Sequence, residues 1–126
     1  MFKIFVFVES VVTEFISTPS NPWKVLERQN ITFEWRYTLD RTFFWFGKFV
    51  NVTGGAQDLI ASTSGGSTTV QPNFQTRFTA DISVTGAKIT MLAVQMSDDR
   101  KKFEFKLLTI HAGFIIDEVE LIVQCK

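Results

Sequence analysis

The chain has few of the residues from which metal and catalytic sites are usually built. Among its 126 residues there is one cysteine, Cys125, and one histidine, His111. A single cysteine cannot form a disulfide within the chain or a multi-cysteine metal cluster, and no serine stands in a nucleophile-elbow sequence. We interpret His111 as a solvated loop residue. The chain is therefore not expected to be an enzyme, and no cofactor or metal is expected.

An excess of charge and a long apolar run are missing as well. The 13 basic residues balance the 13 acidic ones, so the chain has no basic field to attract a nucleic-acid backbone. No run approaches the roughly 18 apolar residues of a membrane span, and Glu9 interrupts the apolar start too early for a signal peptide. We expect neither nucleic-acid binding nor direct membrane insertion by this chain.

Aromatic residues and two-residue alternation dominate what is present. The chain has 14 phenylalanines and 3 tryptophans, and no segment keeps a helical apolar period for long. We expect one all-β domain over residues 1–126, a sandwich or barrel of roughly eight to ten strands. The expected strands are 2–8 and 11–16 (an interrupted first strand), 23–26, 31–37, 43–50, 59–62, 76–84, 87–94, 102–109 and 115–124, with a weak edge strand within 62–73. Pro19 and Pro22 end the first strand, so 23–26 can resume on a neighbouring sheet, and a charged turn at 97–101 precedes 102–109.

The order of motifs resembles a known family. Arg77-Phe78-Thr79 is followed by Ile89 and Met91 and then by the acidic pair Asp98-Asp99, which is the order found in V-set immunoglobulin domains. The resemblance covers nearly the full chain and implies an immunoglobulin-like antiparallel β-sandwich. It also implies that Arg77 pairs with Asp98 or Asp99.

The two disulfide positions of that family are occupied by aromatic residues. The sequence QNITFEW resembles the family's strand B and puts Trp35 at the first cysteine position, while Phe105 stands at the second. The resemblance implies a buried contact between Trp35 and Phe105 in place of the intradomain disulfide, with Trp45 beside it as the strand C tryptophan. Phe103 falls at the tyrosine-corner position, and residues 59–60 match the C′ strand of variable-type domains.

A partner-binding face follows from strand parity. If Trp45 points inward, Phe44 and Phe46 point to the outer face of the sheet, unless a twist, a bulge or loops cover them. Charged residues are expected on the same face, as cross-strand ion pairs or, with Asp117, as a cation site, and the ion pairs are favoured. These residues are Lys102, Glu104, Lys106, Glu118 and Glu120.

Two glycosylation sequons indicate a secretory route. They begin at Asn30 and Asn51. With the resemblance, they favour an extracellular recognition or adhesion module of a single-pass cell-surface protein, similar to invertebrate allorecognition receptors, which binds a copy of itself or a related V-set domain. The alternatives are an intracellular immunoglobulin-like module of a scaffold protein and a carbohydrate-binding sandwich, which would need exposed Trp or Tyr. Cys125 is not expected to stabilise the domain.

Overall fold

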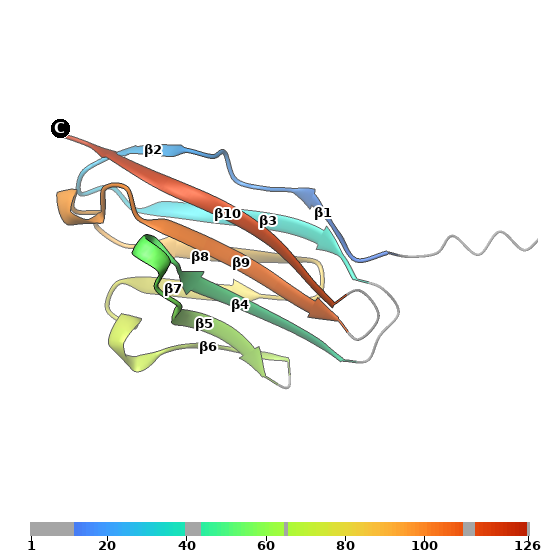
Figure 1. The fold of residues 1–126 in the computed structure, drawn as a ribbon. Coiled ribbons are helices and arrows are strands. Elements are labelled where there is room, and N and C mark those ends of the chain that lie inside the picture. Colours follow the sequence, from blue (N-terminus) through green and yellow to red (C-terminus); the bar gives the residue numbers. More distant parts are fainter. Residues whose placement is uncertain (1–11, 40–43, 65, 110–112, 126) are drawn as a thin grey trace, which may run out of the picture.

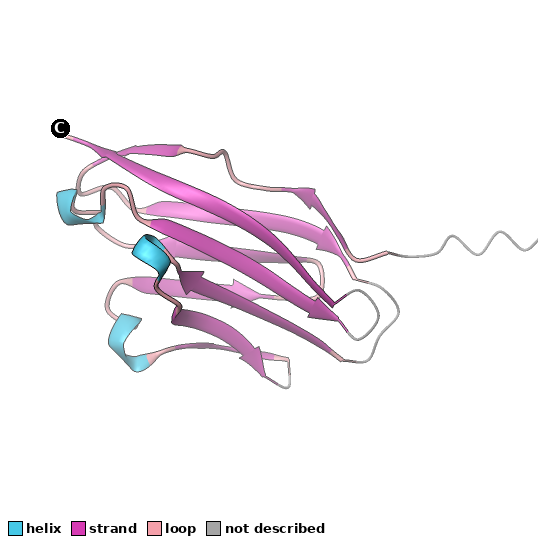
Figure 2. Ribbon diagram, viewed as in Figure 1, coloured by secondary structure: helices cyan, strands magenta, loops and turns pink. Residues whose placement is uncertain are grey.

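The computed structural model describes residues 12–39, 44–64, 66–109 and 113–125. These residues form ten strands and three short 3-10 helices, and Figure 2 shows the helices at the end of the sandwich where the C-terminus lies. The strands are β1 (Glu14–Ser17), β2 (Trp23–Leu26), β3 (Ile31–Thr38), β4 (Trp45–Asn51), β5 (Asp58–Ser64), β6 (Ser67–Val70), β7 (Phe78–Ile82), β8 (Gly86–Met91), β9 (Lys102–Thr109) and β10 (Gly113–Gln124). The helices are η1 (Thr53–Gly55), η2 (Pro72–Phe74) and η3 (Met96–Asp98).

The strands lie in two facing sheets (Figure 1). The four-stranded sheet has the order β1-β3-β8-β7, and the six-stranded sheet has the order β2-β10-β9-β4-β5-β6. Antiparallel pairing holds throughout except between β10 and β2, which run parallel. The expected all-β sandwich is confirmed, including the weak edge strand, which is β6.

The first strand changes sheets, as its prolines suggested. Pro19 and Pro22 lie between β1, which pairs with β3, and β2, which pairs with β10. A proline cannot donate to a strand ladder, so the chain leaves one sheet here and resumes on the other. The part of the expected first strand at residues 2–8 lies outside the described residues.

An aromatic core joins the sheets. Along β3 the residues alternate between buried and exposed, and Phe33, Trp35 and Tyr37 all point inward. The ring of Trp35 stacks on that of Phe105 with centroids 4.9 Å apart and planes at 24°, and both side chains are fully buried. The contact expected at the two cysteine positions is therefore present. A native disulfide contributes about 2–4 kcal/mol, and burial of two large aromatic side chains can contribute a similar amount.

The expectation for Trp45 was wrong. The aromatic ring of β4 that lies beside Trp35 is Phe49, at 5.8 Å between centroids, and Phe49 also stacks on Phe103 at 5.2 Å. Trp45 shares the inward parity of Phe49 but lies at the start of the strand, half-buried at the edge of the core. Between them, Gly47 leaves room for the core: a Cβ there would lie 2.9 Å from Ile82. Residue type had suggested Trp45, whereas strand register selects Phe49.

Two polar side chains of the core are satisfied by partners that the sequence analysis did not anticipate. The indole N–H of Trp35 donates to Asp117 Oδ2 at 2.8 Å, because Asp117 shares the inward parity of β10. The hydroxyl of Tyr37 donates to the carbonyl of Ser83. Burial raises the pKa of Tyr37, and the negative charge of Asp81 raises it further.

The expected arginine–aspartate pair is formed by Asp98, not Asp99. Asp98 is fully buried and accepts from Arg77 at 2.6 Å and from Lys101 at 2.8 Å. Burial opposes ionisation of Asp98, but hydrogen bonds from Lys101, the Gln95 N–H and Arg77 together outweigh it and hold the pKa of this carboxyl below its usual range. Asp99 instead accepts from the backbone N–H of Val123.

Candidate functional site

The outer face of β4, β9 and β10 carries a row of apolar side chains across three neighbouring strands. Strand register places Phe46 directly opposite Leu108, and Leu108 directly opposite Phe114. Side chains that lie directly opposite in antiparallel strands are neighbours on one face. Ile116, two residues along β10, lies on the same face. We call Phe44, Phe46, Leu108, Phe114 and Ile116 the apolar patch.

Much of this patch is open to solvent. Phe44 is 71% exposed, Phe114 50% and Ile116 52%. An open pocket of about 390 Å³ adjoins the patch and is lined almost entirely by apolar atoms, from Phe44, Trp45, Phe46, Leu108, Thr109 and Gly113. The expected outward direction of Phe44 is confirmed, while Phe46 is half-buried on the same face. A contiguous group of exposed large apolar residues on a single domain marks an interaction site more often than scattered ones do.

Charged residues follow the patch along the same strands. Lys102, Glu104 and Lys106 of β9 alternate with the buried residues of that strand and so face outward, as expected. Glu118 and Glu120 of β10 face the same way. The outer surface of the three strands therefore has an apolar end and an end with charges of both signs, which resembles the division of a protein interface into anchors and rim.

The expected ion pairs are not the ones that form. Among the described residues, Lys106 pairs with Glu104 on its own strand at 3.5 Å, and Glu120 pairs with Arg100 at 3.6 Å. Register explains the outcome for Glu118 and Lys106, because Glu118 lies opposite Glu104 and Lys106 lies opposite Ile116. Glu120 does lie opposite Lys102, but its ion pair is with Arg100. No group of three His, Cys, Asp or Glu that could hold a metal occurs in the described part of the chain.

Four residues of this face were missed from the sequence. They are Lys48, Leu108, Phe114 and Ile116. The signal was present for the last two, since the parity of Glu118 and Glu120 continues backward through Ile116 to Phe114. Lys48 is on β4, and its Nζ lies 5.5 Å from the centroid of the Phe114 ring on β10.

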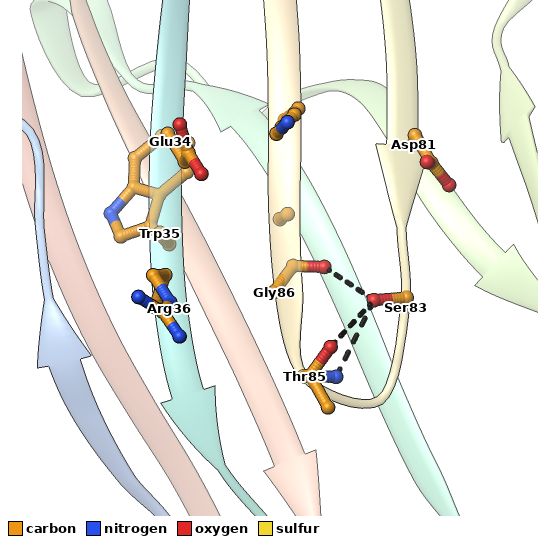
Figure 3. Close-up of a pocket in the computed structure, with 9 residues that line it drawn as sticks. Glu34, Trp35, Arg36, Asp81, Ser83, Thr85 and Gly86 are labelled. Atoms are coloured by element: carbon orange, nitrogen blue, oxygen red, sulfur yellow. Dashed lines mark hydrogen bonds between the residues drawn. The ribbon is translucent and has the colours of Figure 1, made fainter.

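The opposite sheet offers a polar notch instead. Figure 3 shows this pocket, about 180 Å³ in volume, at the start of β8 and the turn that joins it to β7. Gly86 has no side chain here because a Cβ would lie 2.8 Å from the carbonyl oxygen of Trp35. Register places Lys88 directly between Glu34 and Asp81. The notch is thus explained by a required glycine and by a lysine that lies between acidic residues of the two neighbouring strands.

Both sequons lie at the end of the sandwich away from the apolar patch. Asn30 precedes β3, is exposed and accepts from the N–H of Ala93 at 2.8 Å. Asn51 ends β4, is half-buried and accepts from the Thr53 hydroxyl at 2.6 Å. In Figure 1 both strand ends lie on the side of the C-terminus, whereas the start of β10 lies at the opposite end.

Three further expectations concern His111, Cys125 and insertion into a membrane. His111 lies outside the described residues. Cys125 is exposed, and its nearest polar partner is the sulfur of Met96 at 3.9 Å. No helix among the described residues is long and apolar enough to cross a membrane.

These features define a class of fold. The sheet orders, the change of sheet between β1 and β2, the additional strands β5 and β6 and the pair of Arg77 with the buried Asp98 define an immunoglobulin V-type β-sandwich, here without an intradomain disulfide. A solved structure of murine CRIg is similar to this chain, with a TM-score of 0.64 and 16% sequence identity over 90% of this chain and 98% of that chain.

The likeness to known proteins shows the fold of this chain and not its function. No protein-family model and no curated protein sequence matches the chain. In contrast, 1651 chains of solved structures match it, so the likeness is to a widely shared architecture. One fold can serve many functions, so the function of this chain has to be argued from its site.

Proposed function

We propose that this chain is an extracellular recognition or adhesion module of a cell-surface protein, which binds a protein partner through the apolar patch. The partner is a second copy of the chain or a related V-type domain, in the manner of an allorecognition receptor. The patch supplies the apolar anchors, and the charged end of the same face sets register and excludes mismatched partners.

The observation that carries this proposal is the contiguous exposure of large apolar side chains on one face. Phe44, Phe114 and Ile116 are each at least half exposed, and Phe44 also lines an open apolar pocket. Leaving them in water has a cost: burying one such side chain contributes about 1.5–3 kcal/mol. A partner that covers them would recover part of this free energy on binding.

The positions of the sequons support an extracellular assignment for this face. Glycans on Asn30 and Asn51 would stand at the end of the sandwich opposite the patch and would leave it accessible. The side chain of Asn30 is exposed, while that of Asn51 is half-buried and bonded to Thr53. In a secretory host we expect Asn30 to be modified more completely than Asn51.

One observation favours the alternative, an intracellular immunoglobulin-like module of a scaffold protein. The core is closed by stacked aromatic rings and needs no oxidising compartment. Expression with a secretory leader separates the two locations. A secreted, glycosylated and folded product supports the extracellular assignment, and retention without modification supports the intracellular one.

Self-association tests the proposed function. The double variant Phe44→Ser with Phe46→Ser should lose bead aggregation and sediment as a monomer, while the parent associates. Matched controls are Ile16→Ser and Val84→Ser, because these residues are 61% and 55% exposed but lie on the four-stranded sheet and its turn. Circular dichroism checks that each variant is folded.

Two outcomes would contradict the proposal. A folded double variant that associates as the parent does would place the contact elsewhere. A parent chain that stays monomeric at about 100 µM, well above the micromolar range at which avidity makes weak contacts useful, would remove the homophilic partner.

A further inference from the structure

A lysine without an acidic partner stands beside the apolar patch. Lys48 is half-buried on β4, with its ammonium over the ring of Phe114. It forms no ion pair with any described residue, in contrast to Lys106, which pairs with Glu104. A cation held against an aromatic face and partly removed from water favours an approaching carboxylate.

A glutamate without a basic partner stands on the other side of β9. Glu118 is exposed on β10 and lies directly opposite Glu104. Like charges in directly opposite positions destabilise a strand pair, and Glu104 is already paired with Lys106. Glu118 has no ion pair within the described part of the chain, so it would gain from an external cation.

Lys48 and Glu118 lie on opposite sides of β9, on β4 and β10. Lys48 lies in the same row across the strands as Lys106 and Ile116, and Glu118 lies one row further along β10. A two-fold axis that lies in the interface along β9 exchanges β4 with β10 when two copies face each other. It brings Lys48 of one copy over Ile116 of the other, one row from Glu118. Rows on one face are about 7 Å apart and packed sheets about 10 Å. Lys48 and Glu118 can bridge this span together when the Lys48 ammonium turns away from the ring of Phe114, which lies in the row on the other side of Lys48.

The same axis matches the apolar residues. Phe46 of one copy meets Phe114 of the other, and Leu108, which is on β9, meets its own copy. The charges of Lys106 and Glu104 on the axis strand neutralise each other within each copy. An axis perpendicular to the strands would leave Lys48 over β4 of the other copy and would form no such pair.

We propose that two copies of this chain bind face to face about a two-fold axis along β9, with Lys48 of each copy paired to Glu118 of the other. This inference rests on the proposed function and specifies its partner and geometry. Because the contact is isologous, each pair forms twice.

Charge reversal tests this geometry. Lys48→Glu and Glu118→Lys should each weaken self-association about tenfold or more, because two like-charge contacts replace two attractive ones. Mixing the two variants should restore association, because each then meets its complement. The variant that carries both changes should associate with itself as the parent does. Arg36→Glu, at an exposed position of the four-stranded sheet opposite Ser17 and Gly86, is the matched control.

A thiol cross-link tests the axis independently. Leu108→Cys, combined with Cys125→Ser, should be joined into a covalent dimer by a short bis-maleimide because residue 108 meets its own copy across the roughly 10 Å between packed sheets, which is too far for a direct disulfide. Ser62→Cys, on the same sheet but on β5, should not.

The outcomes separate the two proposals. If both charge reversals associate as the parent does while the Phe44 and Phe46 double variant does not, the face is correct and the two-fold geometry is wrong. If single reversals weaken binding but mixing does not restore it, the Lys48–Glu118 pair is wrong. If the double variant also associates normally, the proposed function fails as well.

Discussion

The inner and outer faces of β4, β9 and β10 both carry large apolar side chains, but these are buried on the inner face and largely exposed on the outer face. On the inner face, Phe49, Phe103 and Phe105 are at most 1% exposed and stack on each other or on Trp35. On the outer face of the same strands, Phe114 and Ile116 are at least half exposed. Alternate positions of one strand thus carry the same kind of side chain, and only the inner set is covered by a second sheet.

This difference separates stability from recognition within one sheet. The inner rings replace the intradomain disulfide, so their truncation should lower the free energy of unfolding. The outer apolar side chains are only partly covered by the chain, so their truncation should mainly weaken binding. Substitutions on the inner face should therefore change stability, and substitutions on the outer face should change binding.

The largest stability effect is expected on the inner face. Phe105→Ala removes the ring that stacks on Trp35 and contacts Tyr37, and leaves a cavity between the sheets. We expect a loss of about 3–5 kcal/mol, the usual cost of truncating a buried phenylalanine. Urea denaturation measures it. A near-neutral result would show that the aromatic stack does not hold the sandwich together.

The buried carboxylate of Asp98 should give the next effect. Asp98→Asn breaks its pairs with Arg77 and Lys101, and we expect a loss of about 2–3 kcal/mol, less than for a fully buried pair because both cations are partly exposed. The free energy of unfolding follows from titrations in denaturant.

The pH dependence has a definite sign. Because folding lowers the pKa of Asp98, its contribution is complete above its unfolded pKa of about 4 and is lost as the pH falls through the folded value. The stability difference between parent and Asp98→Asn should therefore shrink below about pH 4. A difference that stays constant through this range would contradict the assignment.

A smaller loss is expected at the inward carboxylate of β10. Asp117→Ala leaves the indole N–H of Trp35 without its acceptor and should cost about 1–3 kcal/mol. Asp117→Asn keeps an acceptor oxygen and should cost less than about 0.5 kcal/mol. Equal losses for the two variants would mean that the hydrogen bond itself contributes little.

The smallest effect is expected at Cys125. Its side chain is exposed and has only a long contact with Met96. Cys125→Ser in reducing buffer should change the free energy of unfolding by less than about 0.5 kcal/mol, as is usual for surface substitutions. Thermal denaturation checks it, and a loss above about 2 kcal/mol would reveal a packed thiol.

The sequence predicted what depends on one strand at a time. Uninterrupted alternation and a charged turn before it placed β9 at residues 102–109, the range the structure shows. The burial of Trp35 and the outward direction of Phe44 followed from parity in the same way. The change of sheet after β1 could be predicted because Pro19 and Pro22 act locally.

What depends on pairing between strands could not be predicted. Phe49, and not Trp45, lies beside Trp35 because of the register of β4 against β9, which no single strand encodes. The same holds for Glu118, which the register of β9 against β10 places opposite Glu104 and not opposite a lysine. Asp117 could be recognised as inward by parity, but its partner Trp35 is on the other sheet.

Sedimentation of Phe114→Ser beside the parent tests the division between the two faces most directly. Phe114 lies at the end of the row that crosses β4, β9 and β10 and is half exposed. We predict that the variant sediments as a monomer at concentrations where the parent associates, and that its free energy of unfolding changes by less than about 0.5 kcal/mol. A folded Phe114→Ser that associates as the parent does, or one that is strongly destabilised, would contradict the assignment of recognition to the outer face.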